Sequence, residues 1–344
     1  MKASYIKRNL IFKKQAGTSR GVLLEKPSWF LIIDKDGKQG IGECSILPKL
    51  SLEKNKDLSP IFESICKEIN LGEVYLKQKW EQYPAVKFAI EMAFQDLNFG
   101  DEKQFYNTTF YTNQKGIQTN GLIWMGSKEE MLSQIDDKIQ KGFTCVKLKI
   151  GAISWDEEID ILKNIRAKYD ENQIELRVDA NGAFHPNNAM TKLEALAELK
   201  IHSIEQPIKS GQWDKMAELC QNTPIPIALD EELIEVTEKS KRLQMLQYIK
   251  PQYIILKPSL IGGFADSEEW VSIAEKLNIG WWATSALESN IGLNAIAQWT
   301  SKMDVTIPQG LGTGSLFTNN ILSPLKIIGD QLFYTQADWQ NINV

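Results

Sequence analysis

Cysteine is scarce in this sequence, with four residues among 344. They are Cys44, Cys66, Cys145 and Cys220. No two of them form a CxxC pair, and each lies in an apolar or amphipathic stretch. This pattern favours buried thiols in a reducing compartment over a redox centre or a thiolate metal site.

Histidine is scarcer still, with two residues. His185 lies in a turn before Pro186, and His202 stands at the start of a predicted strand, the wrong end for catalysis in a β/α barrel. We expect both to be structural, and no Cys–His or Ser–His arrangement indicates nucleophilic catalysis. Acid–base catalysis would therefore need other side chains, and the lysines are the remaining candidates.

Long apolar runs and an excess of positive charge are also missing. The first 15 residues are basic but contain no long apolar stretch, so we predict neither a signal peptide nor a transmembrane segment and expect a cytoplasmic protein. The net charge of -5 argues against a general nucleic-acid-binding protein, which needs a surplus of Lys and Arg. We therefore expect neither a nucleic-acid nor a membrane partner, and the sequence favours no particular oligomeric state.

Residues 1–115 have the pattern of an α+β domain. Residues 3–14 are predicted to form a strand, and apolar runs on both sides of Asp36-Gly37 predict a hairpin. Apolar spacing predicts two helices, over residues 61–71 and 85–99. The hydrophobic content of 43% in 344 residues suffices for a large core in this domain and the next.

Residues 116–311 show a repeated pattern, in which short apolar runs alternate with helix-like segments. Such alternation predicts βαβ units and a parallel sheet. Eight runs favour a closed barrel, with an open doubly wound sheet as the alternative. The predicted strands are 119–124, 144–150, 174–180, 202–206, 225–230, 253–257, 279–285 and 304–308. Residues 312–344 show no further unit of this kind, and we expect them to return to the first domain.

Charged residues stand at the ends of five successive predicted strands. Intervals of 30, 26, 25 and 27 residues separate Lys149, Asp179, Glu205, Asp230 and Lys257. Each interval is one βα unit, so all five side chains are expected at the carboxyl-end face, where barrel enzymes build their active sites. A lone Asp at a strand end is usually a cap and a lone Lys is usually solvated, but five at this spacing are poorly explained by coincidence.

The three carboxylates predict a metal site. Asp179, Glu205 and Asp230 would repel one another and would be costly to desolvate if they converged without a counter-charge. A hard divalent cation removes that problem, and oxygen ligands suit Mg²⁺ or Mn²⁺. We therefore expect these three residues to hold one divalent cation.

Lysines flank the predicted cation on the second and sixth strands. Lys147 lies on the same strand face as Lys149, because the two are two residues apart. Positive charge from the metal and from Lys147 favours the neutral amine of Lys149, which can then act as a general base. Lys257 is expected on the other side of the metal.

The sequence resembles the enolase superfamily and, within it, the muconate-lactonizing-enzyme subgroup. The motifs that carry the resemblance are KxK at 147–149, DAN at 179–181, EQP at 205–207, DE at 230–231 and KPSLIGG at 257–263. The resemblance covers nearly the whole chain. It implies a modified (β/α)7β TIM-type barrel with an N-terminal α+β capping domain that the C-terminal tail completes, and a Lys base that acts with Mg²⁺ on an ene-diolate.

A finer resemblance points to the dehydratases of this subgroup. It is carried by residues 42–45, 47–48, 177–179, 285–289 and 310–320. It implies a hydro-lyase that carries out the syn-dehydration of 2-succinyl-6-hydroxy-2,4-cyclohexadiene-1-carboxylate to 2-succinylbenzoate in menaquinone biosynthesis. Lys149 would remove the α-proton and then assist loss of hydroxide, Lys147 and the metal would hold the developing charge, and Lys257 would stabilise the ring from the opposite face.

Two other functions remain open. Dipeptide epimerases and N-acylamino acid racemases share the five core positions and would use Lys257 as the second acid/base. Epimerases usually carry an Asp-x-Asp motif near the eighth strand, whereas residues 308–313 contain no carboxylate, which favours the dehydratase. A non-catalytic barrel scaffold is the third hypothesis, and the intact set of converging charges argues against it.

The resemblance also implies a small-molecule carboxylate as the partner, and polar groups on the substrate side of the site. Asn181, Arg177 and Ser285 are the candidates, although Arg177 could equally be a structural ion inside the barrel. The loop Ala16–Arg20 is a candidate for closing over the site and contributing to specificity.

Overall fold

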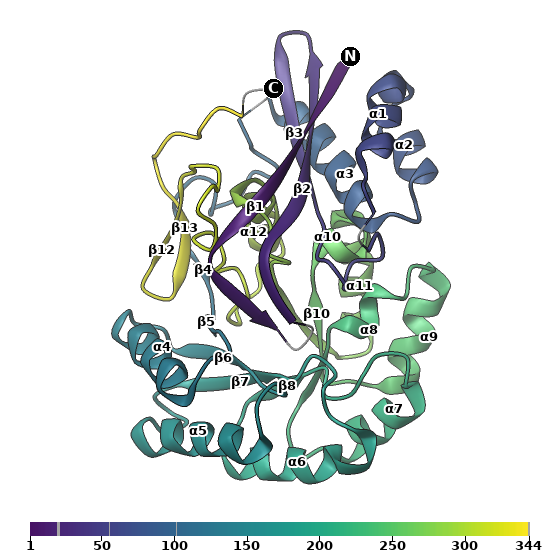
Figure 1. Cartoon of the computed structure of the whole chain (residues 1–344). Helices are drawn as coiled ribbons and strands as arrows, with labels where there is room; N and C mark the ends of the chain where they lie inside the picture. Colours follow the sequence, from purple (N-terminus) through teal and green to yellow (C-terminus); the bar gives the residue numbers. More distant parts are fainter. Residues whose placement is uncertain (19–20, 55, 101, 343–344) are drawn as a thin grey trace.

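The computed structural model describes residues 1–18, 21–54, 56–100 and 102–342, with residues 15–18 described by their backbone alone. Figure 1 shows two parts: an antiparallel sheet with helices on one face, and a barrel of strands and helices below it. The predicted fold class, an α/β barrel of the modified (β/α)7β type with an α+β capping domain, is confirmed. The domain limits at 115/116 and 311/312 stay a prediction.

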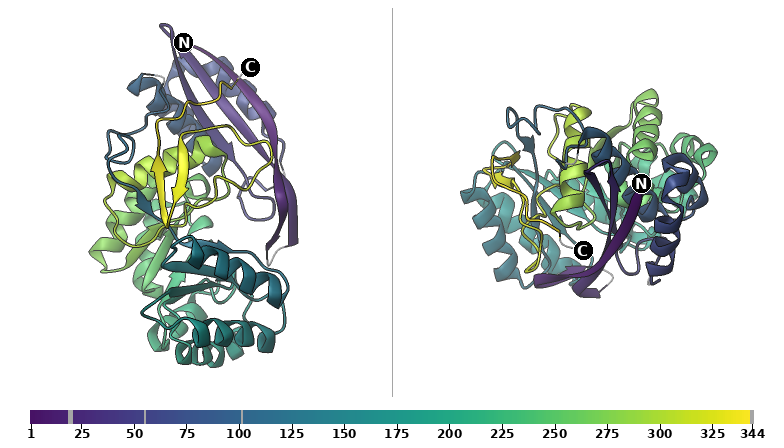
Figure 2. Two further views of the ribbon diagram at one scale, coloured as in Figure 1. Left: turned by 90° about the vertical axis from the view of Figure 1, so that its left-hand side faces the viewer. Right: turned by 90° about the horizontal axis from the view of Figure 1, so that it is seen from above.

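The capping sheet has three antiparallel strands in the order β1-β2-β3. They are β1 (Lys2–Thr18), β2 (Gly21–Lys35) and β3 (Lys38–Ser45). The predicted hairpin is present: Lys35 pairs with Lys38, and Asp36 and Gly37 both have positive φ, 52° and 80°, as a two-residue type I′ turn requires. The strands extend further than the sequence predicted, and the far end of β1 and β2 reaches towards the barrel (Figures 1 and 2).

Helices cover one face of this sheet. They are α1 (Ser59–Glu68), η1 (Ile69–Leu71), α2 (Glu73–Lys79) and α3 (Pro84–Phe99). The two predicted helices are confirmed as α1 with η1 and as α3, whereas α2 was not predicted. Gly42 on β3 allows α3 to lie directly against the strand, because a Cβ there would stand 1.9 Å from the carbonyl oxygen of Ala89.

Seven parallel strands form most of the barrel, in the order β11-β10-β9-β8-β7-β6-β5. They are β5 (Gly121–Ile123), β6 (Cys145–Lys149), β7 (Glu175–Asp179), β8 (Ser203–Glu205), β9 (Ile227–Leu229), β10 (Tyr253–Leu256) and β11 (Gly280–Ala283). Gln309 and Gly310 close the circle, because they form parallel bridges to Thr119 and Thr284. The closed barrel is thus confirmed over the open sheet, but its eighth pairing lies just after the predicted strand 304–308.

Helices between these strands form the outer ring. They are α4 (Lys128–Gln140), α5 (Trp155–Lys168), α6 (Pro186–Glu198), α7 (Trp213–Asn222), α8 (Glu231–Ile234), α9 (Lys239–Ile249), α10 (Pro258–Ile261), α11 (Phe264–Lys276) and α12 (Asn290–Lys302). Capping boxes begin two of them, Ser127 with Glu130 at α4 and Ser154 with Glu157 at α5.

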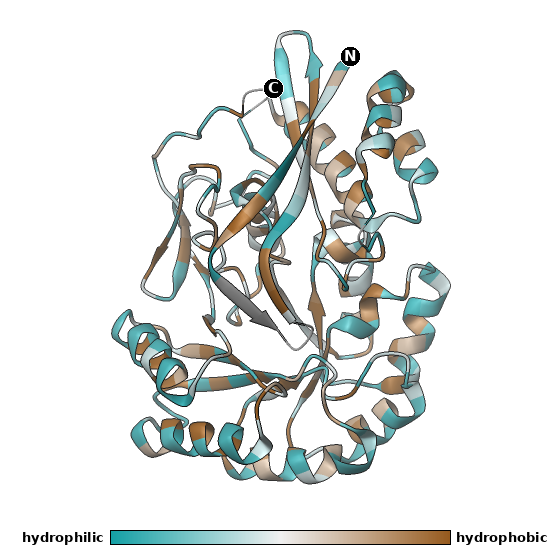
Figure 3. Ribbon diagram, viewed as in Figure 1, coloured by the Kyte–Doolittle hydropathy of each residue, from teal (hydrophilic) through white to brown (hydrophobic). Residues whose placement is uncertain are grey.

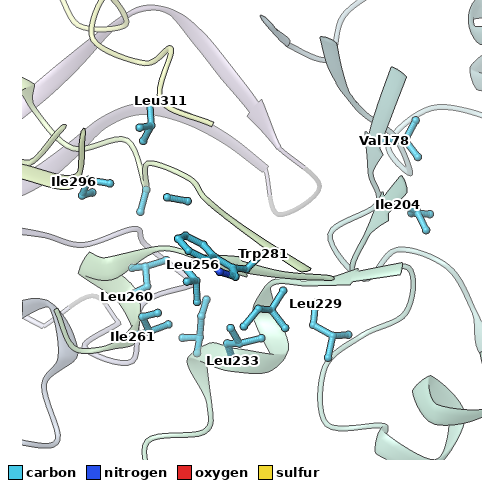
Figure 4. Close-up of a cluster of buried hydrophobic side chains, with 14 of the residues drawn as sticks. Val178, Ile204, Leu229, Leu233, Leu256, Leu260, Ile261, Trp281, Ile296 and Leu311 are labelled. Atoms are coloured by element: carbon cyan, nitrogen blue, oxygen red, sulfur yellow. The ribbon is translucent and has the colours of Figure 1, made fainter. Parts of the chain in front are cut away.

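The hydrophobic core lies between the strands and their helices. Figure 3 shows hydrophobic residues along strands such as β10, whereas α4 to α7 alternate hydrophobic and hydrophilic residues. Figure 4 shows one part of this core, with Leu229 and Leu256 from neighbouring strands near Leu233 and Leu260 from the short helices that follow them. No helix in the described parts of the chain is both long and apolar enough to cross a membrane.

The C-terminal tail first contacts the capping sheet, then pairs with the strand that precedes the barrel, and runs back towards the capping domain (Figure 1). Phe317 forms an antiparallel bridge with Phe12 of β1, and the amide of Lys13 donates to the carbonyl oxygen of Leu316 at 2.8 Å. The tail then forms a hairpin that pairs with the short strand before the barrel. Its strands are β12 (Leu325–Ile328) and β13 (Gln331–Tyr334), and β13 pairs with β4 (Ile117–Gln118).

Gln309 is expected to be essential for barrel closure. Its side chain is fully buried, accepts from the amide of Ala283 at 2.7 Å and donates to the carbonyl oxygen of Ile307 at 2.6 Å. Gln309→Ala leaves both groups unpaired, so we expect the free energy of unfolding in urea to fall by about 2–3 kcal/mol. Gln173→Ala removes an exposed hydrogen bond to Asp170 and should change it by less than about 0.5 kcal/mol. Equal effects of the two substitutions would contradict this role.

Candidate active site

The strand register brings the predicted charges together at one edge of the barrel. Lys149 of β6 is in register with Asp179 of β7, and Asp179 is in register with Glu205 of β8. Asp230 and Lys257 follow β9 and β10 directly, and each stands at the start of a short helix. All five residues therefore lie at the carboxyl ends of neighbouring strands, as the sequence predicted.

Lysines contact all three carboxylates. Lys147 Nζ lies 3.2 Å from Asp179 Oδ2 and 2.6 Å from Glu205 Oε2. Lys149 Nζ lies 2.7 Å from Asp179 Oδ2, and Lys257 Nζ forms an ion pair with Asp230. The three carboxylates are buried, so these ammonium groups supply the counter-charge that they need.

This charge cluster shifts the pKa values of its members in opposite directions. Burial alone would raise the pKa of Asp179, but Lys149 and Lys147 hold it well below its ordinary range. Glu205 shares Lys147 with Asp179, and burial together with repulsion from Asp179 and Asp230 raises its pKa to about 8. Lys147 has a raised pKa because Glu205 and Asp179 outweigh the effect of its burial. Glu205 is thus the carboxylate with the least counter-charge.

The chemistry of these residues fits a divalent cation, although their present spacing does not form a cage. Within the described residues, no three His, Cys, Asp or Glu side chains stand close enough to hold a metal ion, because lysines separate the carboxylates. Glu205 Oε1 is nevertheless buried without a hydrogen-bond partner among those residues. Three carboxylates, one of them with an unpaired buried oxygen, make a donor set suited to Mg²⁺ or Mn²⁺.

A cavity of about 170 Å³ lies directly over this cluster, between the capping domain and the barrel. Lys147, Lys149 and Lys257 all line it. Its other walls are largely apolar and include Leu23, Leu47, Leu50, Leu122, Trp124 and Leu287. Among the described lining residues none is Asp or Glu. The cavity is therefore an apolar space with a cationic floor.

Of the three residues predicted on the substrate side, two line the cavity and one does not. Asn181 and Ser285 line the cavity, and Asn181 accepts from Lys149 Nζ at 2.9 Å. Arg177 does not line it: this buried side chain pairs with Glu175 at 2.7 Å and lies over the ring of Trp282. The structure thus places Arg177 inside the barrel, in the structural role that the sequence left as its alternative. Of the loop Ala16–Arg20, residues 19 and 20 and the side chains of 16–18 lie outside the described residues.

Sequence reasoning missed two features of the site. Glu231 accepts from Asn181 Nδ2 at 3.0 Å, and the adjacent Asp230-Glu231 pair in the sequence was the available signal. The capping domain contributes a large part of the apolar wall, through residues 21–23 and 47–50. No local pattern in the sequence shows that these segments face the barrel.

Comparison with known proteins places the chain in a family. Residues 130–316 match the family model described as "Enolase C-terminal domain-like". The chain is 45% identical to an o-succinylbenzoate synthase of Desulfotalea psychrophila, over 96% of this chain and 98% of that one. The chain therefore belongs to the enolase superfamily.

Solved structures agree with this assignment. The crystal structure of MenC from Desulfotalea psychrophila superimposes with a TM-score of 0.87 at 41% identity, covering 97% of this chain and 99% of that one. The L-Ala-D/L-Glu epimerase of Bacillus subtilis gives a TM-score of 0.83 at 20% identity, covering 97% and 96%, and shares the fold. The enzyme class shown by the first comparison is a hydro-lyase of the enolase superfamily.

The raised pKa of Glu205 predicts proton release when a divalent cation binds. A pKa of about 8 leaves this carboxyl mostly protonated at pH 7, whereas a metal ligand must be ionised. Calorimetric titration of the metal-free protein with Mg²⁺ in buffers of different ionisation enthalpy should show more proton release at pH 7 than at pH 9, because Glu205 is already ionised at the higher pH.

The matched control is Glu205→Gln, which removes the titrating group while keeping its size. It should bind Mg²⁺ more weakly and lose the pH-dependent release. Equal release at both pH values in the unmodified protein would contradict the raised pKa of Glu205.

Proposed function

We propose that the protein is an o-succinylbenzoate synthase, which dehydrates 2-succinyl-6-hydroxy-2,4-cyclohexadiene-1-carboxylate to 2-succinylbenzoate. The observation that carries the proposal is the apolar cavity with Lys147, Lys149 and Lys257 on its floor and no acidic side chain among its described lining residues. The 45% identity to a synthase over nearly the full length of both chains supports it.

The cavity matches the chemistry of this substrate. The substrate carries two carboxylates on a largely apolar ring and chain, so it needs positive charge on one side and hydrophobic walls on the other. Lysines on the second and sixth of eight barrel strands place ammonium groups on opposite sides of the floor. A ring bound between them would meet one lysine on each face.

Lys149 is the residue we assign to proton transfer. Its Nζ reaches the cavity and contacts only Asp179 and Asn181 among the described polar side chains within hydrogen-bond distance. When Asp179 is engaged elsewhere, the neutral amine can accept the α-proton of the substrate, and the resulting ammonium can protonate the hydroxyl that leaves from the same face. Lys147 and Lys257 stay charged and stabilise the negative charge that develops in the transition state.

We assign the metal site to Asp179, Glu205 and Asp230, with Mg²⁺ as the expected ion. When bound, the ion supplies a fixed double positive charge beside the substrate carboxylate. With Asp179, Glu205 and Asp230 holding the ion, Lys149 would no longer have Asp179 as its acidic partner. The proposal includes a place in menaquinone biosynthesis and the cytoplasmic location expected from the sequence, which the four free cysteines support.

An epimerase or racemase activity is the second function to test, because it would use the same lysines. A dipeptide substrate carries an α-ammonium group that needs a carboxylate partner. The wall where epimerases usually carry Asp-x-Asp consists here of Gly310, Gly312 and Thr313. This wall favours the dicarboxylate substrate over a dipeptide.

A substrate panel tests the proposal directly. The purified protein with Mg²⁺ should convert the cyclohexadiene substrate to 2-succinylbenzoate, and should act far more slowly on N-succinyl amino acids and dipeptides. Lys149→Ala should lower kcat for the dehydration roughly 10²–10⁴-fold, because the general base is lost. Lys163→Ala, an exposed lysine of α5, is the control and should retain full activity. Faster turnover of a dipeptide than of the cyclohexadiene would reverse the assignment.

Lys257→Arg separates the two possible roles of Lys257. A synthase needs only positive charge at this position, so the variant should keep kcat within about tenfold, whereas loss of a second acid/base typically costs 10²-fold or more. Steady-state kinetics with the cyclohexadiene substrate measure the difference. A loss as large as that of Lys149→Ala would show that Lys257 exchanges protons in this reaction.

A further inference from the structure

A fully buried lysine lies behind the wall of the active-site cavity. Lys26 of β2 has no exposed surface, and its Nζ donates to Ser45 Oγ within the capping sheet and to the carbonyl oxygen of Leu287 in the barrel at 2.9 Å. Lys26 does not line the cavity itself. It is thus a charged hydrogen-bond donor that crosses the boundary between the capping domain and the barrel.

Two buried carboxylates supply the negative charge around this lysine. Glu43 of β3 accepts from the amides of Ser289 and Gly292, both at 2.9 Å, at the start of α12. Glu288 accepts from Ser285 Oγ at 2.7 Å. Burial lowers the pKa of Lys26, while Glu43 and Glu288 oppose this effect. The three charged groups therefore form one network around residues 285–289, which we call the 285–289 loop.

The 285–289 loop forms part of the cavity wall and has an unusual backbone. Ser285 and Leu287 line the cavity. Leu287 has a φ of 61°, a left-handed conformation that a γ-branched residue rarely adopts without support from its surroundings. Its amide donates to Ser285 Oγ at 3.0 Å, and its carbonyl oxygen accepts from Lys26. Both peptide groups that flank this strained residue are thus held by polar side chains.

We infer that Lys26 is a positioning residue, whose bond to the Leu287 carbonyl oxygen fixes the shape of the cavity wall when the capping domain is docked. The inference rests on the proposed function, since the cavity it concerns is the same one. An apolar side chain of similar size could fill the space of Lys26, but it could not hold the Leu287 carbonyl oxygen. The partly buried carbonyl would then lose the donor that Lys26 supplies, and the left-handed backbone at Leu287 would lose one of its two supports.

Lys26→Met tests this role, because it keeps the size of the side chain and removes the donor. We expect KM for the cyclohexadiene substrate to rise at least tenfold while kcat stays within about threefold, since Lys26 does not touch the reacting atoms. Amide hydrogen exchange of the peptide containing residues 285–292 should become at least tenfold faster. Lys87→Met is the control: it breaks the ion pair between Lys87 and Asp266, which also joins the capping domain to the barrel, away from the cavity lining. It should leave KM within twofold.

The double variant Lys26→Met/Glu43→Gln distinguishes positioning from general stability. Removing the lysine alone leaves buried carboxylates without their counter-charge, so Lys26→Met should also be less stable. Neutralising Glu43 should restore much of the melting temperature while KM stays raised. Recovery of KM together with stability, or unchanged KM and exchange in Lys26→Met, would overturn the inference.

The experiment still tests the inference if a variant does not fold or if the proposed function fails. If Lys26→Met does not fold, the double variant carries the same comparison of KM and exchange. If the unmodified protein does not turn over the cyclohexadiene, the proposed function fails, and hydrogen exchange of residues 285–292 still decides whether Lys26 holds the 285–289 loop.

Discussion

Buried carboxylates that face one another at the end of a parallel sheet need positive charge in contact with them. In this protein the requirement is met by Lys147, Lys149 and Lys257, which contact Asp179, Glu205 and Asp230. The same lysines form the floor of the cavity. The ammonium groups that balance the charge of the buried carboxylates are therefore the same groups that would contact a substrate. If the carboxylates bound a divalent cation instead, the lysines would be available for catalysis.

The barrel fixes this arrangement through strand register. Each βα unit returns the chain to the next parallel strand, and the register of β6, β7 and β8 aligns Lys149, Asp179 and Glu205 in one row. Spacing along the sequence is thus converted into proximity in space, which explains why the charged residues could be predicted from intervals of about one unit. The predictions for the hairpin at Asp36-Gly37 and for the helices over residues 61–71 and 85–99 succeeded for a similar reason, since turn and period signals are local.

Features that depend on contacts between distant segments could not be predicted in this way. The eighth barrel pairing at Gln309 and Gly310 consists of two bridges, too short to give a period. The short helices α8 and α10 begin directly after Asp230 and Lys257 and have four residues each, too few to show a helical repeat. Nothing in the sequence around Lys26 distinguishes it from an exposed lysine, and only the docking of the capping domain shows that it is buried against Leu287. Arg177, which lies two residues before Asp179 in the sequence, was a candidate for the site. The sequence does not reveal that its side chain faces a different layer of the barrel, where it contacts Glu175 and Trp282.

We propose that one divalent cation replaces the lysines as the partner of the three carboxylates. A crystal structure of the protein grown with Mg²⁺ and 2-succinylbenzoate tests it most directly. We expect one ion coordinated by Asp179, Glu205 and Asp230, with the product carboxylate beside it and with Lys147 and Lys149 no longer paired with those side chains. An ion bound elsewhere, or carboxylates that remain paired with the lysines while the product is bound, would contradict the account.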